Sequence, residues 1–396
     1  MPLITGSDHR YPDRNSRVAS PGELCDKYAV SNLWIMAELY SKTGGARCSV
    51  AFILRKKVKI IMDKTVTLAH GSGGKPMHEL IAKIFAKHLS NELLNTGDDG
   101  ARFDVPASKL AFSTDSYVIS PLFFKGGNIG KLAVCGTVND LSTSGAVPKY
   151  MSCGFIIEEG FPLEELEEIA ASMAETARES GVLVVTGDTK VVPKGAADKL
   201  FINTSGIGLI PDGCDISGHN ARLGDKVIVT GTLGDHGCAI LLEREQLGIR
   251  TNIKSDCAPL AGMVHGLLAT TGGVHVLRDP TRGGLATTLN EIALQSNIGI
   301  KLSEESLPIK EETNGICGML GMDPLYMANE GKMVVIVCPQ EAECALAALK
   351  AHTYGKEACI IGEVIQNQAG RVFMETISGG SRILDMLQRE QLPRIC

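Results

Sequence analysis

The sequence lacks several features that would place it in a specialised class of proteins. It has no apolar run close to the roughly 20 residues that a membrane-spanning helix needs, and no export signal is recognisable. Its 12 cysteines include no C-x-x-C pair, since even the closest two, Cys338 and Cys344, are six positions apart. This spacing argues against a zinc or redox protein. The net charge of −6 argues against a dedicated nucleic-acid binder. We therefore expect a protein of the reducing cytoplasm that binds neither membranes nor nucleic acid.

The charge is distributed unevenly between the first 61 residues and the rest. Residues 1–61 contain 10 basic and 5 acidic residues, whereas residues 62–396 contain 29 basic and 40 acidic residues. The short apolar run 51–54 is followed by a basic cluster, which is the wrong order for a signal peptide. We interpret residues 1–61 as an unmatched, disordered extension, translated from an earlier start. A targeting or partner-binding arm is the alternative.

From Met62 onward, segments with the pattern of strands alternate with segments with the pattern of helices. Leu166, Ile169 and Met173, for example, recur at helical spacing. We expect helices at 76–89, 131–141, 163–177 and 285–294, and strands at 110–118, 150–157, 182–185, 201–210, 226–229 and 332–337. The turn-rich stretch 211–218 is typical of a domain boundary. The sequence thus predicts an α/β (α+β) fold with two domains, 62–214 and 215–385, and a mobile tail, 386–396.

A glycine-rich segment at residues 70–74 precedes the first expected helix. Backbone N–H groups that no side chain covers, a neighbouring lysine and a helix N-terminus together suit a phosphate group. The candidate phosphate-binding residues are Gly71, Gly73, Gly74 and Lys75. The segment is not a Walker A loop, because G-x-x-x-x-G-K-[ST] is absent, and a flexible glycine connector explains it equally well.

Aspartates stand beside glycine-rich turns or at the ends of expected strands and helices, where ligand sites of α/β proteins usually lie. They are Asp115, Asp140, Asp188 and Asp279. Any one of them can simply cap a helix or a turn, but four in such positions favour a site for Mg²⁺ and a nucleotide. Arg282, at the start of an expected helix, is a candidate phosphate contact. A surface arginine at a helix cap is the alternative.

Two further residues have chemistry that the sequence alone leaves open. Glu330 precedes an apolar strand and is either a base or, more simply, a solvated turn residue. Cys396 is the last residue, so its thiol stands on an untethered end that is able to reach other sites. A terminal cysteine can also be accidental.

Taken in order, these motifs resemble the HypE family of hydrogenase maturation factors, the carbamoyl dehydratases. That family belongs to the ATP-using superfamily of aminoimidazole ribonucleotide synthetase, selenophosphate synthetase and thiamine-monophosphate kinase. The resemblance covers residues 62–396 and rests on the segments 70–74, 113–116, 136–141, 187–190, 278–284, 329–331 and 393–396. It implies two α/β domains, a homodimer formed through the N-terminal sheet, and ATP-binding clefts near the dimer interface.

The resemblance also implies a reaction carried out on the terminal cysteine. A carbamoyltransferase partner, HypF, places a carbamoyl group on Cys396, and ATP then phosphorylates the carbamoyl oxygen. Loss of a proton and of phosphate leaves a thiocyanate. Its cyanide passes to iron in the HypC–HypD complex and becomes a ligand of NiFe hydrogenase. A small-molecule kinase, a selenophosphate-type synthetase and a non-catalytic group carrier are the alternative functions.

Matching the motifs of this family to the sequence assigns a role to each candidate residue. Asp115, Asp140 and Asp279 would be the metal ligands. The nucleotide contacts would be Asn139, Asp188, Arg282 and the glycine-rich segment with Lys75. Lys190 and Glu330 would position and deprotonate the carbamoyl nitrogen, and Cys396 would carry the group.

Overall fold

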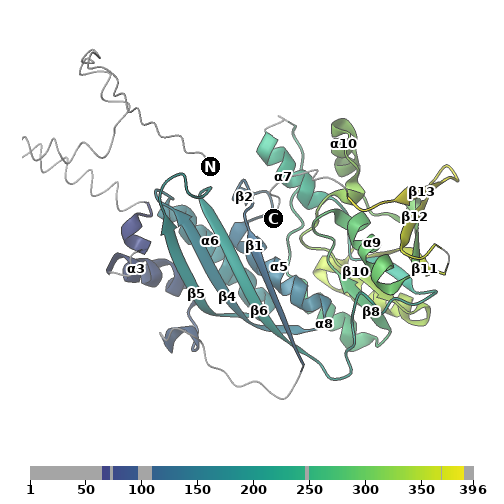
Figure 1. Cartoon of the computed structure of the whole chain (residues 1–396), viewed down its shortest axis with the longest axis horizontal. Coiled ribbons are helices and arrows are strands. Elements are labelled where there is room, and N and C mark those ends of the chain that lie inside the picture. The colour runs from purple at the N-terminus through teal and green to yellow at the C-terminus, as the bar shows by residue number, and fades with distance from the viewer. Residues whose placement is uncertain (1–64, 72–74, 97–108, 246–248, 367, 388–396) are drawn as a thin grey trace, which may run out of the picture. The chain divides into compact units, whose positions relative to one another are not determined.

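The computed structural model describes residues 65–71, 75–96, 109–245, 249–366 and 368–387 (Figure 1). The predictions made for the 1–61 extension, Gly73, Gly74, the side chain of Lys75 and Cys396 lie outside the described residues. Within the described part, no helix is both long and apolar enough to cross a membrane.

The first half of the chain forms a four-stranded sheet with the order β1-β6-β4-β5. Its strands are β1 (Lys109–Tyr117), β4 (Val147–Glu158), β5 (Leu183–Val192) and β6 (Leu200–Ile210). β4 and β5 run parallel, and the other neighbouring pairs run antiparallel. Helices α5 (Ile129–Thr143) and α6 (Leu163–Ser180) cover one face, on which alternate strand residues are buried (Figure 1). On the other face, alternate residues of β1 are exposed.

Local sequence features set the ends of both covering helices. The Asn128 side chain caps α5, because its Oδ1 accepts hydrogen bonds from the N–H groups of Gly130 and Lys131 at 2.9 and 3.1 Å. Gly181 ends α6 in the left-handed conformation at φ 69°. Because the cap fixes where α5 begins, Asp140 falls in its last turn, beside β1.

The second half forms a seven-stranded sheet with the order β13-β12-β9-β11-β7-β10-β8. The strands are β7 (Lys226–Val229), β8 (Val274–Arg278), β9 (Gly299–Ser303), β10 (Val334–Val337), β11 (Cys359–Ile365), β12 (Arg371–Glu375) and β13 (Ser381–Leu384). One core on this sheet includes α9 (Gly284–Ser296), and another includes α8 (Ala261–Thr270) and α11 (Ala342–Ala351). α7 (Asp235–Glu245) and α10 (Glu311–Leu320) instead contribute to the core of the first sheet, so that core contains residues from both halves of the chain.

The predicted α/β fold class is confirmed, and the expected elements are present with shifted ends. The helix predicted at 76–89 consists of α3 (Lys75–Leu80), a π-helical turn (Ile81–Phe85) and α4 (Ala86–Leu89), and a short β2 (Phe123–Phe124) and β3 (Gly127–Asn128) pair was not predicted. Between β6 and β7 no helix or strand is present, whereas the domain limits at 214 and 385 stay predictions.

One expectation about a strand end was wrong. Asp188 and Lys190 were expected in a turn after a strand at 182–185, but β5 continues to Val192. The reason is the parallel partner β4, which pairs Asp188 with Gly154 and Lys190 with Ile156 and so extends the ladder.

Candidate active site

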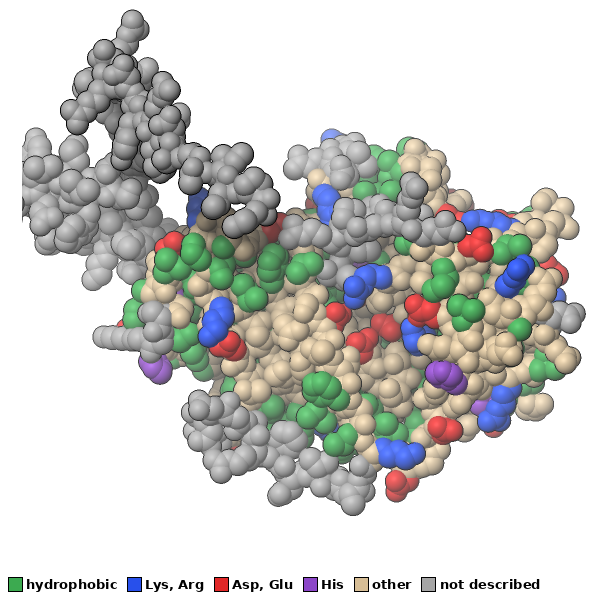
Figure 2. All heavy atoms as spheres, viewed as in Figure 1, with side chains coloured by type: hydrophobic (Ala, Val, Ile, Leu, Met, Phe, Trp, Pro, Cys, Tyr) green, Lys and Arg blue, Asp and Glu red, His purple; other side chains and the backbone are tan. Residues whose placement is uncertain are grey.

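Two adjoining cavities lie where the edge strand β1, helix α5 and the start of α9 meet. Their volumes are about 430 and 180 Å³, and they share Asp140, Asp279, Thr281 and Arg282 in their walls. Asp115 and Glu330 line the smaller cavity. We call these walls, with the carboxyl groups of Asp115, Asp140, Asp279 and Glu330, the acidic cavity. Figure 2 shows acidic and basic side chains gathered in the middle of this face, between the positions of β1 and α9.

The carboxyl group of Asp140 joins α5 to β1 through a hydrogen bond. Its Oδ2 accepts a hydrogen bond from Ser113 Oγ at 2.7 Å. Burial raises the pKa of Asp140, and the negative charge of nearby Asp115 raises it further, while the Ser113 hydrogen bond acts in the opposite direction. The carboxylate is therefore held in place while its charge is poorly compensated.

Two arginines border the acidic cavity. The guanidinium of Arg282 lies 3.8 Å from Asp115 Oδ1, and its side chain is 71% exposed. Arg278 forms an ion pair with Glu291 of α9. After Arg282 the chain turns into α9 through Gly283 and Gly284, both at positive φ (76° and 60°). This turn brings the N-terminus of a 13-residue helix to the cavity wall, where its N–H groups favour an anion.

Asp279 and Glu330 are the most strongly perturbed acids of the cavity. Burial raises the pKa of Asp279 to about 7, and the charges of Asp140 and Asp115 act in the same direction. Burial also raises the pKa of Glu330 well above its usual range, with a further contribution from Asp279. Glu330 is only 4% exposed, and its Oε1 has no hydrogen-bond partner among the described residues. A buried carboxyl oxygen without a partner inside a cavity is typical of a group that awaits a ligand.

The donor set fits a magnesium ion that is shared with a phosphorylated ligand. The mutual repulsion of Asp115, Asp140 and Asp279 would be relieved by a cation. However, no group of three or more His, Cys, Asp or Glu in the described part of the chain is arranged to hold a metal by itself. Magnesium commonly binds through one or two carboxylates and completes its octahedron with phosphate and water oxygens.

Asn139 does not line either cavity, although it was predicted to contact the nucleotide. Its side chain is buried, and Nδ2 donates to the carbonyl oxygens of Ala258 (3.1 Å) and Glu330 (3.4 Å). Its Oδ1 accepts from the N–H of Leu260 at 2.8 Å. In the described structure Asn139 therefore positions the loop of Glu330, and a nucleotide contact by its side chain would require these bonds to break.

A second set of predicted residues lies elsewhere, on β5 and the adjoining turn. Asp188 and Lys190 are 3.7 Å apart, and their side chains are 64% and 66% exposed. Gly71 packs against β5, since a Cβ on it would approach Val191 Cβ to 2.8 Å. We call Gly71, Asp188 and Lys190 the β5 group; none of them lines the acidic cavity.

The sheet itself separates the β5 group from the acidic cavity. Asp115 pairs with the buried Thr204, whereas Asp188 pairs with Gly154 and so falls in register with the exposed Asn203 and Ser116. Asp115 thus points to the helix-covered face, and Asp188 points to the open face. Three strand spacings, roughly 14 Å, also lie between them.

Several residues of the site were missed by the sequence analysis. Ser113, Arg278 and Thr281 stood within motifs that were recognised, and the polar character of those motifs was the available signal. Lys332 and Asp256 form a buried ion pair behind Glu330. Nothing in the sequence around Asp256 pointed to it, because its partner lies 76 residues further along the chain.

Comparisons with known proteins agree with this architecture. Residues 97–210 match the N-terminal domain of AIR synthase related proteins, and residues 222–375 match the C-terminal domain. The fold is accordingly that of the AIR synthase related class.

Within that class the similarity is specific. The chain is 53% identical over 338 residues to carbamoyl dehydratase HypE of Rhizobium leguminosarum bv. viciae, which covers 85% of this chain and 96% of that protein. A crystal structure of hydrogenase maturation protein HypE in complex with ATP has a TM-score of 0.81 and 51% identity, covering 84% of this chain and 100% of that chain. A crystal structure of a HypE–HypF complex has a TM-score of 0.69 and 50% identity, and the match covers 78% of this chain and 99% of that chain.

The chain belongs to the HypE family, whose members are carbamoyl dehydratases and hydrogenase maturation proteins. It is therefore an enzyme of hydrogenase maturation.

Proposed function

We propose that this chain uses ATP to dehydrate a carbamoyl group on its terminal Cys396 and so supplies cyanide for the iron of NiFe hydrogenase. The observation that carries the proposal is the acidic cavity: four carboxyl groups, a bordering Arg282 and a helix N-terminus converge in one cavity. That combination suits a magnesium–nucleotide. The relative that was crystallised with ATP supports the same ligand.

The proposed reaction balances as a dehydration. The S–C(=O)–NH₂ oxygen attacks the γ-phosphorus of ATP, and ADP leaves. The nitrogen then loses its protons, and the C–O bond breaks to release phosphate, which takes the oxygen away. An S–C≡N group remains on Cys396. An amide oxygen is a poor leaving group, and phosphorylation is what makes its departure feasible.

Each wall of the acidic cavity has a role in this proposal. Asp115, Asp140 and Asp279 would hold Mg²⁺, which neutralises charge on the phosphates when it is bound. Arg282 and the N-terminus of α9 would contact the phosphates, with the glycine-rich segment and Lys75 as further contacts. Glu330 would accept the proton from nitrogen. Because burial raises its pKa, Glu330 must first be ionised, and a cation beside Asp279 favours that form.

The exit point of the C-terminal tail supports delivery of Cys396 to this cavity. The N–H of Leu387 donates to Thr287 Oγ1 at 3.4 Å, and Thr288 lines the larger cavity. Nine residues follow Leu387 up to Cys396. A chain of that length spans at most about 30 Å when extended, which is enough to enter the cavity.

We also propose a homodimer formed through the open face of the first sheet. Apolar side chains on this face are exposed, among them Leu110 (51%), Phe112 (68%) and Ile156 (43%). Phe112 and Thr114 belong to this face and also line the cavities, so the cavities reach around the edge strand β1. A two-fold axis along the strands would set β5 of one subunit over β1 of the other. Lys190 and Asp188 would then act on the partner's acidic cavity.

The partners follow from the same chemistry. Transfer of a carbamoyl group to Cys396 requires a carbamoyltransferase, and the relative crystallised as a HypE–HypF complex supports HypF in that role. The HypC–HypD complex is the proposed acceptor of the cyanide.

Intact-mass spectrometry tests the proposal directly. With HypF, carbamoyl phosphate, ATP and Mg²⁺, we expect the C-terminal peptide to gain one carbamoyl group and then to lose one water in an ATP-dependent step. Cys396→Ser should abolish both changes, and Cys344→Ser, which alters an exposed cysteine, should abolish neither. Full ATP turnover by Cys396→Ser would instead favour a small-molecule kinase or synthetase.

A further inference from the structure

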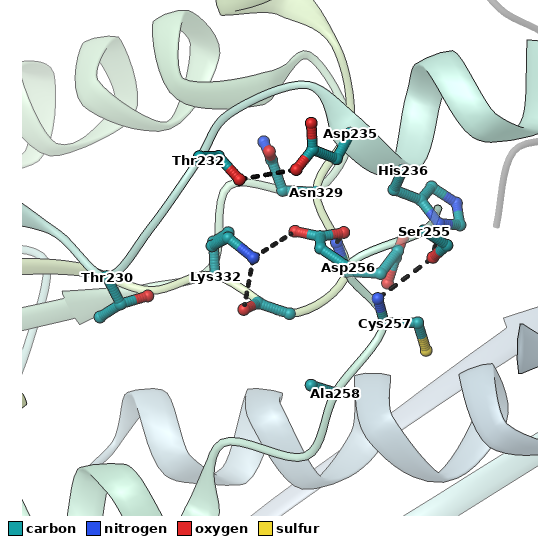
Figure 3. A network of polar contacts seen from close by, with 12 residues as sticks. Thr230, Thr232, Asp235, His236, Ser255, Asp256, Cys257, Ala258, Asn329 and Lys332 are labelled. Carbon is teal, nitrogen blue, oxygen red and sulfur yellow. Dashed lines mark hydrogen bonds and ion pairs between the residues drawn. The ribbon is translucent and has the colours of Figure 1, made fainter. Parts of the chain in front are cut away.

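The backbone of Glu330 rests on a buried ion pair that does not itself line the cavities. Lys332 Nζ lies 3.1 Å from Asp256 Oδ2, and the two side chains are only 11% and 4% exposed. The other oxygen, Asp256 Oδ1, accepts a hydrogen bond from the Glu330 N–H at 3.0 Å. One carboxylate therefore joins the lysine to the main chain of Glu330, as the central part of Figure 3 illustrates for Lys332 and Asp256.

Gly331, which lies between Glu330 and Lys332, allows the loop of Glu330 to contact the loop of Asp256. A Cβ at Gly331 would lie 1.8 Å from the Asp256 carbonyl oxygen, so only glycine permits the two loops to approach so closely. The Lys332 Nζ also lies 3.4 Å from the Gly331 carbonyl oxygen.

The carbonyl oxygen of Glu330 is held as well, by two longer hydrogen bonds. The Ala258 N–H donates to the Glu330 carbonyl oxygen at 3.4 Å, and Asn139 Nδ2 donates to the same oxygen at the same distance. Asn139 in turn is bound to the loop through Ala258 and Leu260. The main chain at Glu330 is thus fixed from α5 and from the loop after α7, while its carboxyl group faces the cavity and its Oε1 has no hydrogen-bond partner in the described part of the chain.

A buried ion pair is a costly way to stabilise a loop. Desolvation of two charges offsets most of their attraction, and apolar residues of similar size often do as well. What the pair provides that apolar residues do not is direction: Asp256 presents one oxygen to Lys332 and the other to the Glu330 N–H.

We propose that Asp256 and Lys332 act as positioning residues, which hold the main chain of Glu330 so that its carboxyl group enters the acidic cavity at the place of proton transfer. The role rests on the proposed function of Glu330. Misplacement of a reacting group by about 1 Å is enough to lower a rate by roughly two orders of magnitude.

The test uses the full-length chain with the ion pair replaced by apolar residues of similar size, Asp256→Leu together with Lys332→Met. The double variant leaves no unpaired buried charge, so we expect it to fold. We expect kcat for ATP-dependent water loss from carbamoylated Cys396 to fall about 10-fold or more, with KM for ATP changed less than about 2-fold. Either single variant should have a still lower kcat than the double variant, because it leaves one charge buried without its partner.

The matched control is Asp225→Leu. Asp225 is also buried, and its Oδ2 accepts from the N–H of Arg222 and contacts His275 Nδ1, both at 2.8 Å, but it does not line the cavities. We expect its kcat to stay within about 2-fold of the wild-type value. A double variant with wild-type kcat, or a control that loses as much, would overturn the positioning role.

A crystal structure of the double variant separates this proposal from the proposed function. We expect the Glu330 carboxyl group to leave its position or to lose a single conformation. An unmoved Glu330 overturns the proposal, whatever the wild-type chain catalyses. Absence of water loss in the wild-type chain would count against the proposed function alone.

Discussion

The acidic cavity and the β5 group are two sets of charged residues that the chain assembles in different ways. The cavity takes its carboxyl groups from four separate places, namely β1, α5, the segment after β8 and the loop before β10. The β5 group comes from a single strand and the turn that packs on it. Burial and mutual repulsion raise the pKa of Asp140 and Asp279, whereas Asp188 is 64% exposed beside Lys190.

This difference shows how the properties of an acidic residue change when several acids are buried in one cavity. Charges that are buried together carry an unfavourable energy that a cation or a phosphate-bound metal can remove, so the cavity is prepared for a ligand. An exposed pair such as Asp188 and Lys190 is already solvated and gains little from any ligand on its own chain. Its use would come from a second subunit.

The largest expected effect is on the rate, from a change inside the cavity. Asp140→Asn should slow ATP-dependent water loss from carbamoylated Cys396 by about 10²- to 10³-fold, because it removes a carboxylate that is proposed to hold the Mg²⁺ ion on the phosphates. Asp212→Asn, in an exposed turn outside the cavities, is the control and should retain the wild-type rate. Retention of the rate by Asp140→Asn would favour a non-catalytic carrier.

A smaller effect of opposite sign is expected on stability. Folding raises the pKa of Asp279 to about 7, so the folded state holds the proton more tightly than the unfolded state. The contribution of Asp279 to folding stability is fully present below the pKa that Asp279 has in the unfolded chain. It is lost as pH rises through about 7. Asp279→Asn should therefore stabilise the ligand-free protein by on the order of 2 kcal/mol at pH 8 and hardly at pH 4. Denaturant unfolding at both pH values measures this, and an equal effect at both would contradict it.

Mixing two variant subunits tests whether the β5 group of one subunit acts on the acidic cavity of the other. If the partner's β5 group completes each acidic cavity, a mixture of Asp140→Asn and Lys190→Met chains contains mixed dimers with one intact site. About a quarter of the wild-type activity should then return when the chains are mixed one to one and allowed to exchange. Activity no higher than the mean of the two separate variants would mean that Lys190 acts only within its own chain, or not at all.

The smallest expected effect concerns the β5 group alone. Lys190→Met should change the free energy of unfolding by less than about 0.5 kcal/mol, because the ion pair with Asp188 is 3.7 Å long and mostly exposed. Thermal unfolding at two salt concentrations measures this. A fall in the free energy of unfolding of more than about 1 kcal/mol would show instead that the β5 group stabilises the fold.

Much of the fold was predictable because its signals are local. The helical spacing of Leu166, Ile169 and Met173 predicted α6, and all three are buried. The extent of β5 was not predictable, because its second half is a strand only by virtue of pairing with β4. The acidic residues of the cavity were recognised within polar motifs near turns or the ends of strands and helices, but Asp256 had no such signal.

The sequence by itself determined the alternation of strands and helices, the set of candidate aspartates and the family to which the chain belongs, because each depends on residues that are close in sequence or on motifs in a fixed order. Only the tertiary structure decided which candidates share a site. Pleating sends Asp115 and Asp188 to opposite faces of one sheet, and strand order places them at its opposite edges. Long-range contacts bring Asp140, Asp279 and Glu330 together from distant parts of the chain, and the burial that follows shifts their pKa values.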